Sequence, residues 1–299
     1  MFNRSVAFAG LAVWLCAGVA GAGAQVAPQS SPSAVVPPAS PAPAVSPAPA
    51  ETPAGPSDPC TSLSNLVSRP TFSTAACAVK PRDLLIETGY TNATTSGNGA
   101  GNLVTYPQAS VRVGLGHNLE VDLDPDSLAR LSGPPAINGT TDSAIGAKYE
   151  FGYTSNLVYG VNVLYTLATG SPPFTGNGNG ILANLNAGLS LSPAFSLFAT
   201  LGYNEQSAGT PVVPARVHDV QPSLGATLSL PQSFDVFLEG YDQSATAPGL
   251  GGRFGYDTGF QKDVGSRLQL DFNYFDYLGV QNGAHLHSIG FGAAYLVGS

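Results

Sequence analysis

The chain has 299 residues, of which only 10% are charged, with 36 glycines, 25 prolines and a formal net charge of -8. Soluble domains usually contain about 25% charged residues, so this composition argues against an ordinary soluble protein. Net acidity and the scarcity of lysine and arginine also argue against nucleic acid as a partner.

The first 24 residues are typical of a secretory signal. Arg4 supplies the positive charge, an apolar stretch runs from Val6 to Val19, and Ala22-Gly23-Ala24 forms a small-residue cleavage site. The apolar stretch is too short for an anchoring helix, and no later run of 18 apolar residues follows it. We therefore predict that residues 1–24 are a signal peptide that directs the chain through the inner membrane.

Residues 25–59 consist almost wholly of proline, alanine, serine and valine. Such a segment cannot form a core, and its composition predicts a polyproline-like, semi-rigid linker. A spacer in the periplasm and a docking segment for a partner or the cell wall both fit, although no motif supports docking.

Cys60 and Cys77 are the only cysteines after the predicted signal. In an oxidising compartment such a pair is expected to form a disulfide, which predicts a short, closed periplasmic segment at residues 60–81. The spacing is not CxxC and no histidine is near, which argues against a metal or redox centre. The closed loop either lies against the mouth of the domain that follows or enters that domain as a plug.

Residues 82–299 alternate between apolar and polar side chains in about twelve segments. The clearest pair spans residues 144–165, where Ile145, Tyr149 and Phe151 share a face and Lys148 and Glu150 share the opposite one. Segments of about ten residues have the length of a tilted strand that crosses a bilayer. The predicted strands are 82–91, 106–116, 119–124, 144–153, 157–165, 181–191, 195–203, 217–230, 234–241, 254–260, 268–274 and 289–297.

Alternation alone also fits a soluble β-sandwich. Here, charges lie in mid-strand on one face and aromatic residues lie near the ends of the other, and short connections alternate with long ones rich in Gly, Pro, Ser and Asn. This arrangement favours an all-β fold, an antiparallel up-and-down transmembrane β-barrel of about 12 strands, over a Greek-key sandwich. The phase is weakest in 234–241, because Phe237 and Tyr241 fall on the predicted lumen face.

The segments RDLLIETGYT (82–91) and ASVRVGLGHNLEVDLD (109–124) resemble a family of outer-membrane transporters labelled for the meta-pathway of phenol degradation. The resemblance implies a channel or uptake barrel in the bacterial outer membrane, with aromatic compounds as candidate substrates. Many such barrels end in an aromatic residue that the barrel-assembly machinery reads. This chain instead ends Tyr295-Leu296-Val297-Gly298-Ser299, so either Tyr295 serves as the signal or the signal is degenerate.

Acidic residues outnumber basic ones on the predicted lumen face. An open pore with this lining would favour cations, whereas in a filled barrel the same side chains would form a network of ion pairs and hydrogen bonds. The candidate lumen-lining residues are Glu87, Arg112, Glu120, Asp122, Lys148, Glu150, Asn162, Asn184, Asn186, Asp235, Glu239, Arg253, Asp257, Arg267 and Asp271.

No enzyme or metal motif survives inspection. Residues 122–126 begin like a calcium loop, but the central glycine is replaced by Ser127 and the final acid by Gly133. His285 and His287 share a strand face, yet no third ligand is near in sequence. We therefore predict no enzymatic activity, no metal and no cofactor.

The leading functional hypothesis is passive diffusion of small solutes through or along a charged lumen, with hydrophobic or aromatic compounds among the candidates. The alternative is a non-conducting barrel with a structural or surface-binding role. Membrane lipid and a small solute are the expected partners, and the oligomeric state stays open.

Overall fold

The computed structural model describes residues 58–133, 136–176, 178–207, 215–247, 250–279 and 281–298. The predicted signal peptide and residues 25–57 of the predicted linker lie outside the described residues. A 3-10 helix, η1 (Pro59–Thr61), and one turn of α-helix, α1 (Leu63–Leu66), precede the strands. Among the residues that the structure describes, no helix has the length and apolarity that crossing a membrane requires.

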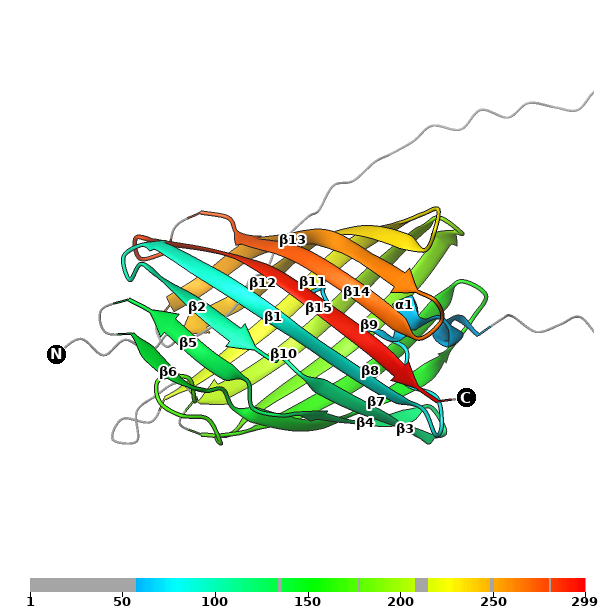
Figure 1. Ribbon diagram of the computed structural model, residues 1–299, viewed down its shortest axis with the longest axis horizontal. Helices are drawn as coiled ribbons and strands as arrows, with labels where there is room; N and C mark the ends of the chain where they lie inside the picture. The colour runs from blue at the N-terminus through cyan, green and yellow to red at the C-terminus, as the bar shows by residue number, and fades with distance from the viewer. Residues whose placement is uncertain are drawn as a thin grey trace, which may run out of the picture. The chain divides into compact units, whose positions relative to one another are not determined.

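Almost all of the remaining described residues lie in one antiparallel sheet (Figure 1). Its strands are β1 (Leu84–Gly97), β2 (Gly101–Tyr106), β3 (Ser110–Gly116), β4 (Leu119–Asp124), β5 (Leu128–Ser132), β6 (Ile137–Thr140), β7 (Ser143–Tyr153), β8 (Leu157–Leu167), β9 (Gly180–Ser192), β10 (Phe195–Ser207), β11 (Arg216–Leu230), β12 (Phe234–Ala247), β13 (Leu250–Val264), β14 (Leu268–Tyr277) and β15 (Ala284–Val297).

The sheet closes into a barrel because β1 pairs with β15 along its whole length, from Leu84 opposite Val297 to Gly97 opposite Ala284. Three positions of the barrel are interrupted strands. β2 and β3 both pair with β1, β4 and β5 continue one position, and β6 and β7 continue another. The barrel therefore has 12 strands, and the predicted fold class is confirmed.

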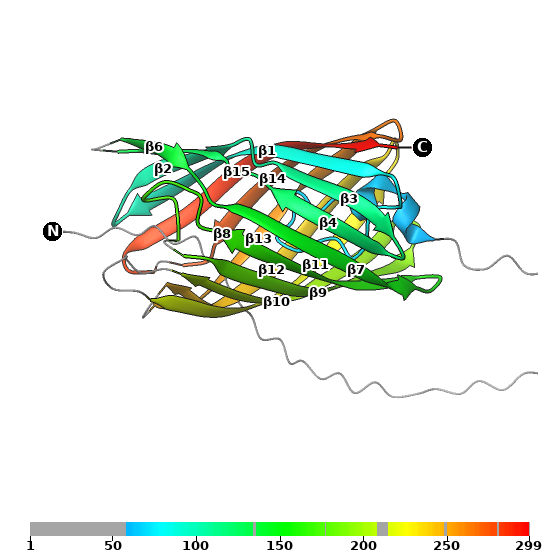
Figure 2. The same cartoon turned by 90° about the horizontal axis from the view of Figure 1, so that it is seen from below.

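The strands are interrupted at 107–109, 125–127 and 141–142. β7 pairs with β8, but β6, on the other side of the last interruption, does not continue this pairing. β6 lies at the end of the barrel where β2 and β6 are labelled in Figure 2. The connection after β8 covers the free edge of β6: the Ser171 amide donates to the Thr140 carbonyl at 3.0 Å, and the Thr140 amide donates to the Ser171 hydroxyl at 2.8 Å. At the neighbouring interruption, hydroxyl groups of Ser143 and Thr169 donate to Asp126 and lower the pKa of its carboxyl.

The connections at one end of the barrel are tight turns, at 117–118, 154–156, 193–194, 231–233 and 265–267. His117 and Asn118 have φ values of 53° and 61°, as the two central residues of a type I′ hairpin require. Because short turns face the periplasm in outer-membrane barrels, we assign this end, which also holds the start of β1 and the end of β15, to the periplasmic side.

At the opposite end, the strands continue into segments that the sequence pattern predicts as long loops. β1 ends at Gly97, β10 at Ser207 and β12 at Ala247, several residues beyond the predicted ends. These extensions are rich in Thr, Asn, Gln and Ser, so they pair through their backbones without the apolar alternation by which strands are predicted. Longer connections remain at 168–179, 208–215 and 278–283.

The distribution of apolar and polar side chains over the two faces of the barrel is the reverse of that in a soluble protein. Large apolar side chains point outward, with Leu224 and Leu238 63% and 59% exposed, whereas the inward-facing Glu120 and Lys148 are 0% and 1% exposed. Such an apolar outer surface is suited to lipid, and the closed ladder satisfies the backbone groups there. Tyr295, the candidate assembly signal, lies on this outer face with 46% exposure.

Candidate functional site

Residues 58–80, which we call the plug, lie inside the barrel at its periplasmic end, where η1 and α1 are drawn in blue in Figure 1. Apolar residues of the plug, among them Leu66 and Val79, pack against Leu85, Val158 and Ala294 of the wall. Of the two placements that the sequence leaves open, the structure therefore shows the plug.

A disulfide joins Cys60 to Cys77 and closes the plug into a loop. Both cysteines are buried, at 0% and 1% exposure. An ion pair of 2.6 Å between Lys80 and Asp58 draws the two ends of the plug together just outside this loop.

We expect replacement of both Cys60 and Cys77 by serine to loosen the plug while leaving the barrel closed. The chain-entropy model assigns a loop of this size about 3 kcal/mol, so opening of the plug should become on the order of a hundredfold more frequent. Chymotrypsin cleavage after Phe72 should accelerate accordingly, while cleavage in the exposed connection at Leu278 should not change. Equal cleavage rates at Phe72 in both proteins would contradict a stabilising role of the disulfide.

Lumen carboxylates accept hydrogen bonds from backbone amides in the middle of the plug. Glu87 accepts from the amides of Ser68 and Arg69 at 3.2 and 3.1 Å. Glu239 accepts from the amides of Phe72 and Ser73 at 2.9 and 3.0 Å. Hydrogen bonds to charged groups are about twice as strong as neutral ones, so the plug is anchored largely through its main chain.

The same kind of contact recurs at neighbouring positions. Asp257 accepts from the amide of Phe72 at 3.1 Å. Glu150 accepts from the Ala78 amide at 3.1 Å, and Glu120 accepts from the Val79 amide at 2.5 Å. Five candidate lumen residues therefore bind the plug itself.

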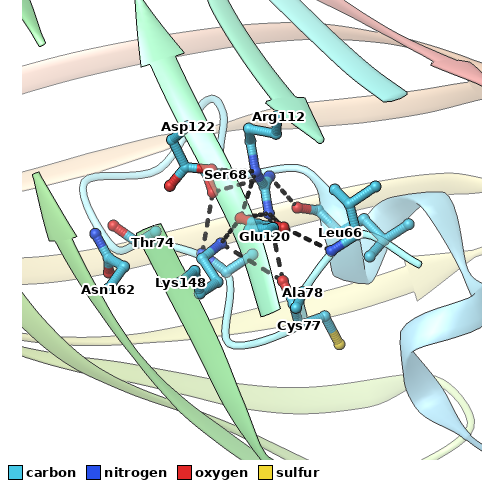
Figure 3. Close-up of polar contacts among 12 residues, drawn as sticks. Leu66, Ser68, Thr74, Cys77, Ala78, Arg112, Glu120, Asp122, Lys148 and Asn162 are labelled. Atoms are coloured by element: carbon cyan, nitrogen blue, oxygen red, sulfur yellow. Dashed lines mark hydrogen bonds and ion pairs between the residues drawn. The ribbon is translucent and has the colours of Figure 1, made fainter. Parts of the chain in front are cut away.

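Arg112 is the centre of the charged cluster in Figure 3. Its guanidinium lies 2.8 Å from both Glu87 and Glu120. It also donates to the carbonyls of Leu66 and Cys77, at 2.5 and 3.3 Å. One buried side chain therefore joins two carboxylates of the wall to two points of the plug, at Leu66 and at Cys77.

Lys148 is the second buried cation of this cluster. Its ammonium lies 3.2 Å from Glu120 and donates to the Cys77 carbonyl at 3.5 Å. Asp122 lies at the margin, 3.9 Å from Arg112. The lumen cations are thus shared between wall carboxylates and plug carbonyls.

Amide side chains of β13 and β14 bind carbonyls of the plug. Gln261 donates to the Arg69 carbonyl at 2.7 Å, and Asn273 donates to the Pro70 carbonyl at 3.0 Å. The wall thus binds both main-chain groups of the plug: its carboxylates accept hydrogen bonds from amides, and its amide side chains donate hydrogen bonds to carbonyls.

The Arg69 side chain lies across two wall glycines, 3.7 Å from the carboxylate of Asp271. A Cβ built on Gly89 would come within 2.3 Å of its guanidinium carbon, and one on Gly292 within 2.5 Å of its Nε. A larger residue at either position would therefore displace this guanidinium, the flexible end of the Arg69 side chain.

Aromatic side chains pack at the tip of the plug. The ring of Phe72 stacks on Tyr241 with centroids 4.1 Å apart, and Tyr241 stacks on Phe275 at 5.6 Å. Phe237 and Tyr241, whose position weakens the sequence phase of β12, are both buried in the lumen. The two aromatic residues that break the alternation of β12 therefore lie around the plug.

The other candidate residues lie outside the ion pairs of Arg112 and Lys148, although Asn162 is the cross-strand partner of Lys148. Asn162, Asn184 and Asn186 are buried side by side on β8 and β9, and Asn186 donates to Asn162 at 2.8 Å. Arg253 lies over the ring of Tyr277, 3.9 Å from its centroid, and Asp235 is half-buried near the start of β12.

Arg267 differs from its predicted position. It is exposed in the turn 265–267, because β14 begins only at Leu268. A lumen role for Arg267 is therefore not compatible with the structure.

Sequence reasoning misses the plug residues that the carboxylates bind. Their recognised groups are backbone carbonyls, which every residue carries, and backbone amides, which every residue other than proline carries, so no side-chain pattern reveals them. The imbalance between many mid-strand acids and few bases is the one available signal. Glutamine and asparagine at Gln261 and Asn273 are common polar residues and give no signal.

An outer apolar cavity of about 320 Å³ lies in the extracellular half of the lumen. Its walls include Ala93, Leu103 and Ala129, which form a buried cluster, together with Phe174 of the connection after β8 and Phe275 of β14. The lining is predominantly apolar, unlike the charged cluster below it.

A middle polar cavity of about 340 Å³ adjoins the outer one, since Gln108 and Thr141 line both. Its lining includes Arg112 and Lys148 of the charged cluster and Thr74 of the plug. An inner cavity of about 120 Å³ lies beyond the plug and reaches the periplasmic turn at 154–156. The cavities thus succeed one another from the extracellular end to the periplasmic end.

No known family profile matches the chain, and no curated protein matches it. The fold does match solved structures. An outer-membrane channel from Pseudomonas putida F1 superposes with a TM-score of 0.59 at 14% identity, over 76% of this chain and 100% of that one. The porin NanC gives a TM-score of 0.49 at 11% identity, over 70% and 98% of the two chains. The chain therefore has the fold of outer-membrane channel barrels.

Proposed function

We propose that this protein is an outer-membrane channel through which small solutes diffuse, and that compact apolar or aromatic compounds are among them. The observation that carries the proposal is the outer apolar cavity, which leads directly into the middle polar cavity. Ligand sites are commonly concave, predominantly apolar and on the order of 300–1,000 Å³. The shared fold with the channel from Pseudomonas putida F1 agrees with this proposal.

The apolar lining indicates the kind of solute. Ala93, Leu103, Ala129 and Phe275 offer carbon surface without buried charges, so a solute rich in polar groups would lose hydration there without compensation. A monocyclic aromatic compound fits, because even an apolar cavity of about 150 Å³ binds benzene. The polar groups of Gln108 and Thr141 would meet such a solute only at the passage to the middle cavity.

The test is single-channel recording of the refolded full-length protein, with toluene as the probe. We expect discrete conductance steps that toluene reduces by occupying the outer cavity. Ala129→Phe should fill that cavity and remove the toluene effect, whereas Ala183→Phe, on the outer face of β9, should leave it intact. Toluene block that persists in Ala129→Phe would contradict this binding position.

The alternative, a non-conducting structural or surface-binding barrel, is favoured by the tight anchoring of the plug by Glu87, Glu120 and Glu239. Electrical silence from wild-type protein that is demonstrably closed would support it. Heat-modifiable mobility on gels identifies the closed barrel in the same sample.

A further inference from the structure

Thr74 of the plug occupies a distinct position between two cavities. In the described part of the chain, it alone lines both the middle polar cavity and the inner cavity. The middle cavity connects outward through Gln108 and Thr141, and the inner one reaches the periplasmic turn at 154–156. At this point the two cavities therefore meet at a single shared residue of the plug.

The plug is anchored on both sides of Thr74. Before it, the amides of Phe72 and Ser73 donate to Glu239, and after it the amides of Ala78 and Val79 donate to lumen glutamates. These contacts hold the main chain of this segment in place, and they fix the position from which the Thr74 side chain projects.

The wall opposite Thr74 is polar and uncharged. Asn184 donates to the Thr74 hydroxyl at 3.3 Å, a long bond that is weak compared with those of the carboxylates. Asn162, which lines the middle cavity, accepts from Asn186 at 2.8 Å, and Thr200 donates to Asn186 at 2.8 Å. The asparagines are thus held by one another, and Figure 3 shows Thr74 beside Asn162 and away from the Arg112 contacts.

We propose that Thr74 and Asn184 form the narrowest partition of the channel, and that the size of the side chain at position 74 sets the rate of solute passage. This inference rests on the proposed channel function. Both residues of the partition are uncharged, so it acts by size and by exchange of one weak hydrogen bond. Small uncharged solutes and hydrated monovalent ions are the species it would pass.

The first test compares Thr74→Gly and Thr74→Trp with the wild type in planar bilayers and in liposome swelling with arabinose. We expect Thr74→Gly to raise both conductance and swelling several-fold and Thr74→Trp to lower both. Thr61→Trp is the matched control, because Thr61 is an exposed threonine of the plug that lines neither the inner nor the middle cavity. It adds the same bulk to the plug and should behave as the wild type.

The second test introduces Thr74→Cys and applies a small, membrane-impermeant methanethiosulfonate reagent from each side in turn. Since Thr74 lines both cavities, the thiol should react from either side and the adduct should reduce conductance. Ser64 lines the inner cavity but not the middle one, so Ser64→Cys should react from the periplasmic side alone. If Thr74 merely supports the plug, the thiol should not react from both sides and the reagent should not change the conductance.

The outcomes separate this inference from the proposed function. A conducting wild type with unchanged conductance in both Thr74→Gly and Thr74→Trp would overturn the partition and leave the channel standing. A silent wild type with a conducting Thr74→Gly would support the partition and contradict spontaneous passage in the native protein. Silence from all of these closed barrels would overturn both.

Discussion

Removal of the plug, in a mature chain that begins at Pro81, is expected to raise single-channel conductance several-fold and to make the pore select for cations. The plug fills the periplasmic half of the lumen, so its loss replaces packed atoms with water along that half. It also releases carboxylates whose present partners are amides of the plug. These are Glu87, Glu120, Glu150, Glu239 and Asp257.

Cation selectivity follows from the charges that stay behind. The wall keeps only Arg112 and Lys148 as buried cations near these acids in the described residues, and carboxylate rings favour cations in open pores. The reversal potential under a salt gradient measures this selectivity. The full-length protein should show weaker selectivity, because its plug amides already neutralise part of the acidic field.

The barrel itself should persist without the plug. Every strand except β6 is paired on both sides, with β1 closing on β15, and the outer apolar face does not involve residues 58–80. Heat-modifiable mobility of the shortened chain is therefore the control for closure. A closed, shortened barrel with the conductance of the full-length protein would show that the plug is not the barrier.

A gentler variant tests the same point without a deletion. Glu239→Ala with Glu150→Ala removes the acceptors for Ser73 and Ala78 and one of the two acceptors for Phe72, while every residue of the plug is kept. We expect intermittent openings toward the level of the shortened chain, since each lost charged hydrogen bond contributes about 1.5–3 kcal/mol. An invariant wild-type current would argue against anchoring by these carboxylates.

The barrel is readable from sequence because alternation reports directly which face meets lipid. Ile145, Tyr149 and Phe151 are 43–48% exposed on the outer face, and Lys148 and Glu150 on the same strand are 1% exposed, as their spacing predicts. Tight turns such as 117–118 also indicate the register between neighbouring strands. Because side chains alternate with a period of two, the register decides the face on which each side chain lies.

The contents of the lumen are less predictable, because an inward-facing charge has the same pattern whether it meets water, another side chain or a main-chain amide. Glu239 and Asp257 would suggest a cation pathway by sequence, yet they accept hydrogen bonds from Phe72. The plug carries few charges of its own, so the sequence of residues 62–79 does not indicate which wall residues bind it. Only the fold brings these segments together.

Arg112→Ala is expected to destabilise the folded barrel by about 3–5 kcal/mol, because it leaves buried acids without their cation. The side chain of Arg112 is 3% exposed and lies 2.8 Å from Glu87 and from Glu120. The change also removes the donor to the Leu66 and Cys77 carbonyls. Urea unfolding in lipid vesicles, followed by heat-modifiable mobility, measures the effect.

Two further variants locate the origin of that loss. Arg130→Ala, at an exposed position of β5, should change stability by no more than about 0.5 kcal/mol, and equal effects of Arg112→Ala and Arg130→Ala would contradict the buried cluster. If the cost arises from unpaired charge, adding Glu87→Gln to Arg112→Ala should recover part of it, since a neutral amide is cheaper to bury than a lone carboxylate. If it arises instead from lost packing, the second substitution should recover nothing. Because Arg112 binds both wall and plug, the stability of the barrel and the closure of its lumen should then fall together in Arg112→Ala and recover together in the double variant.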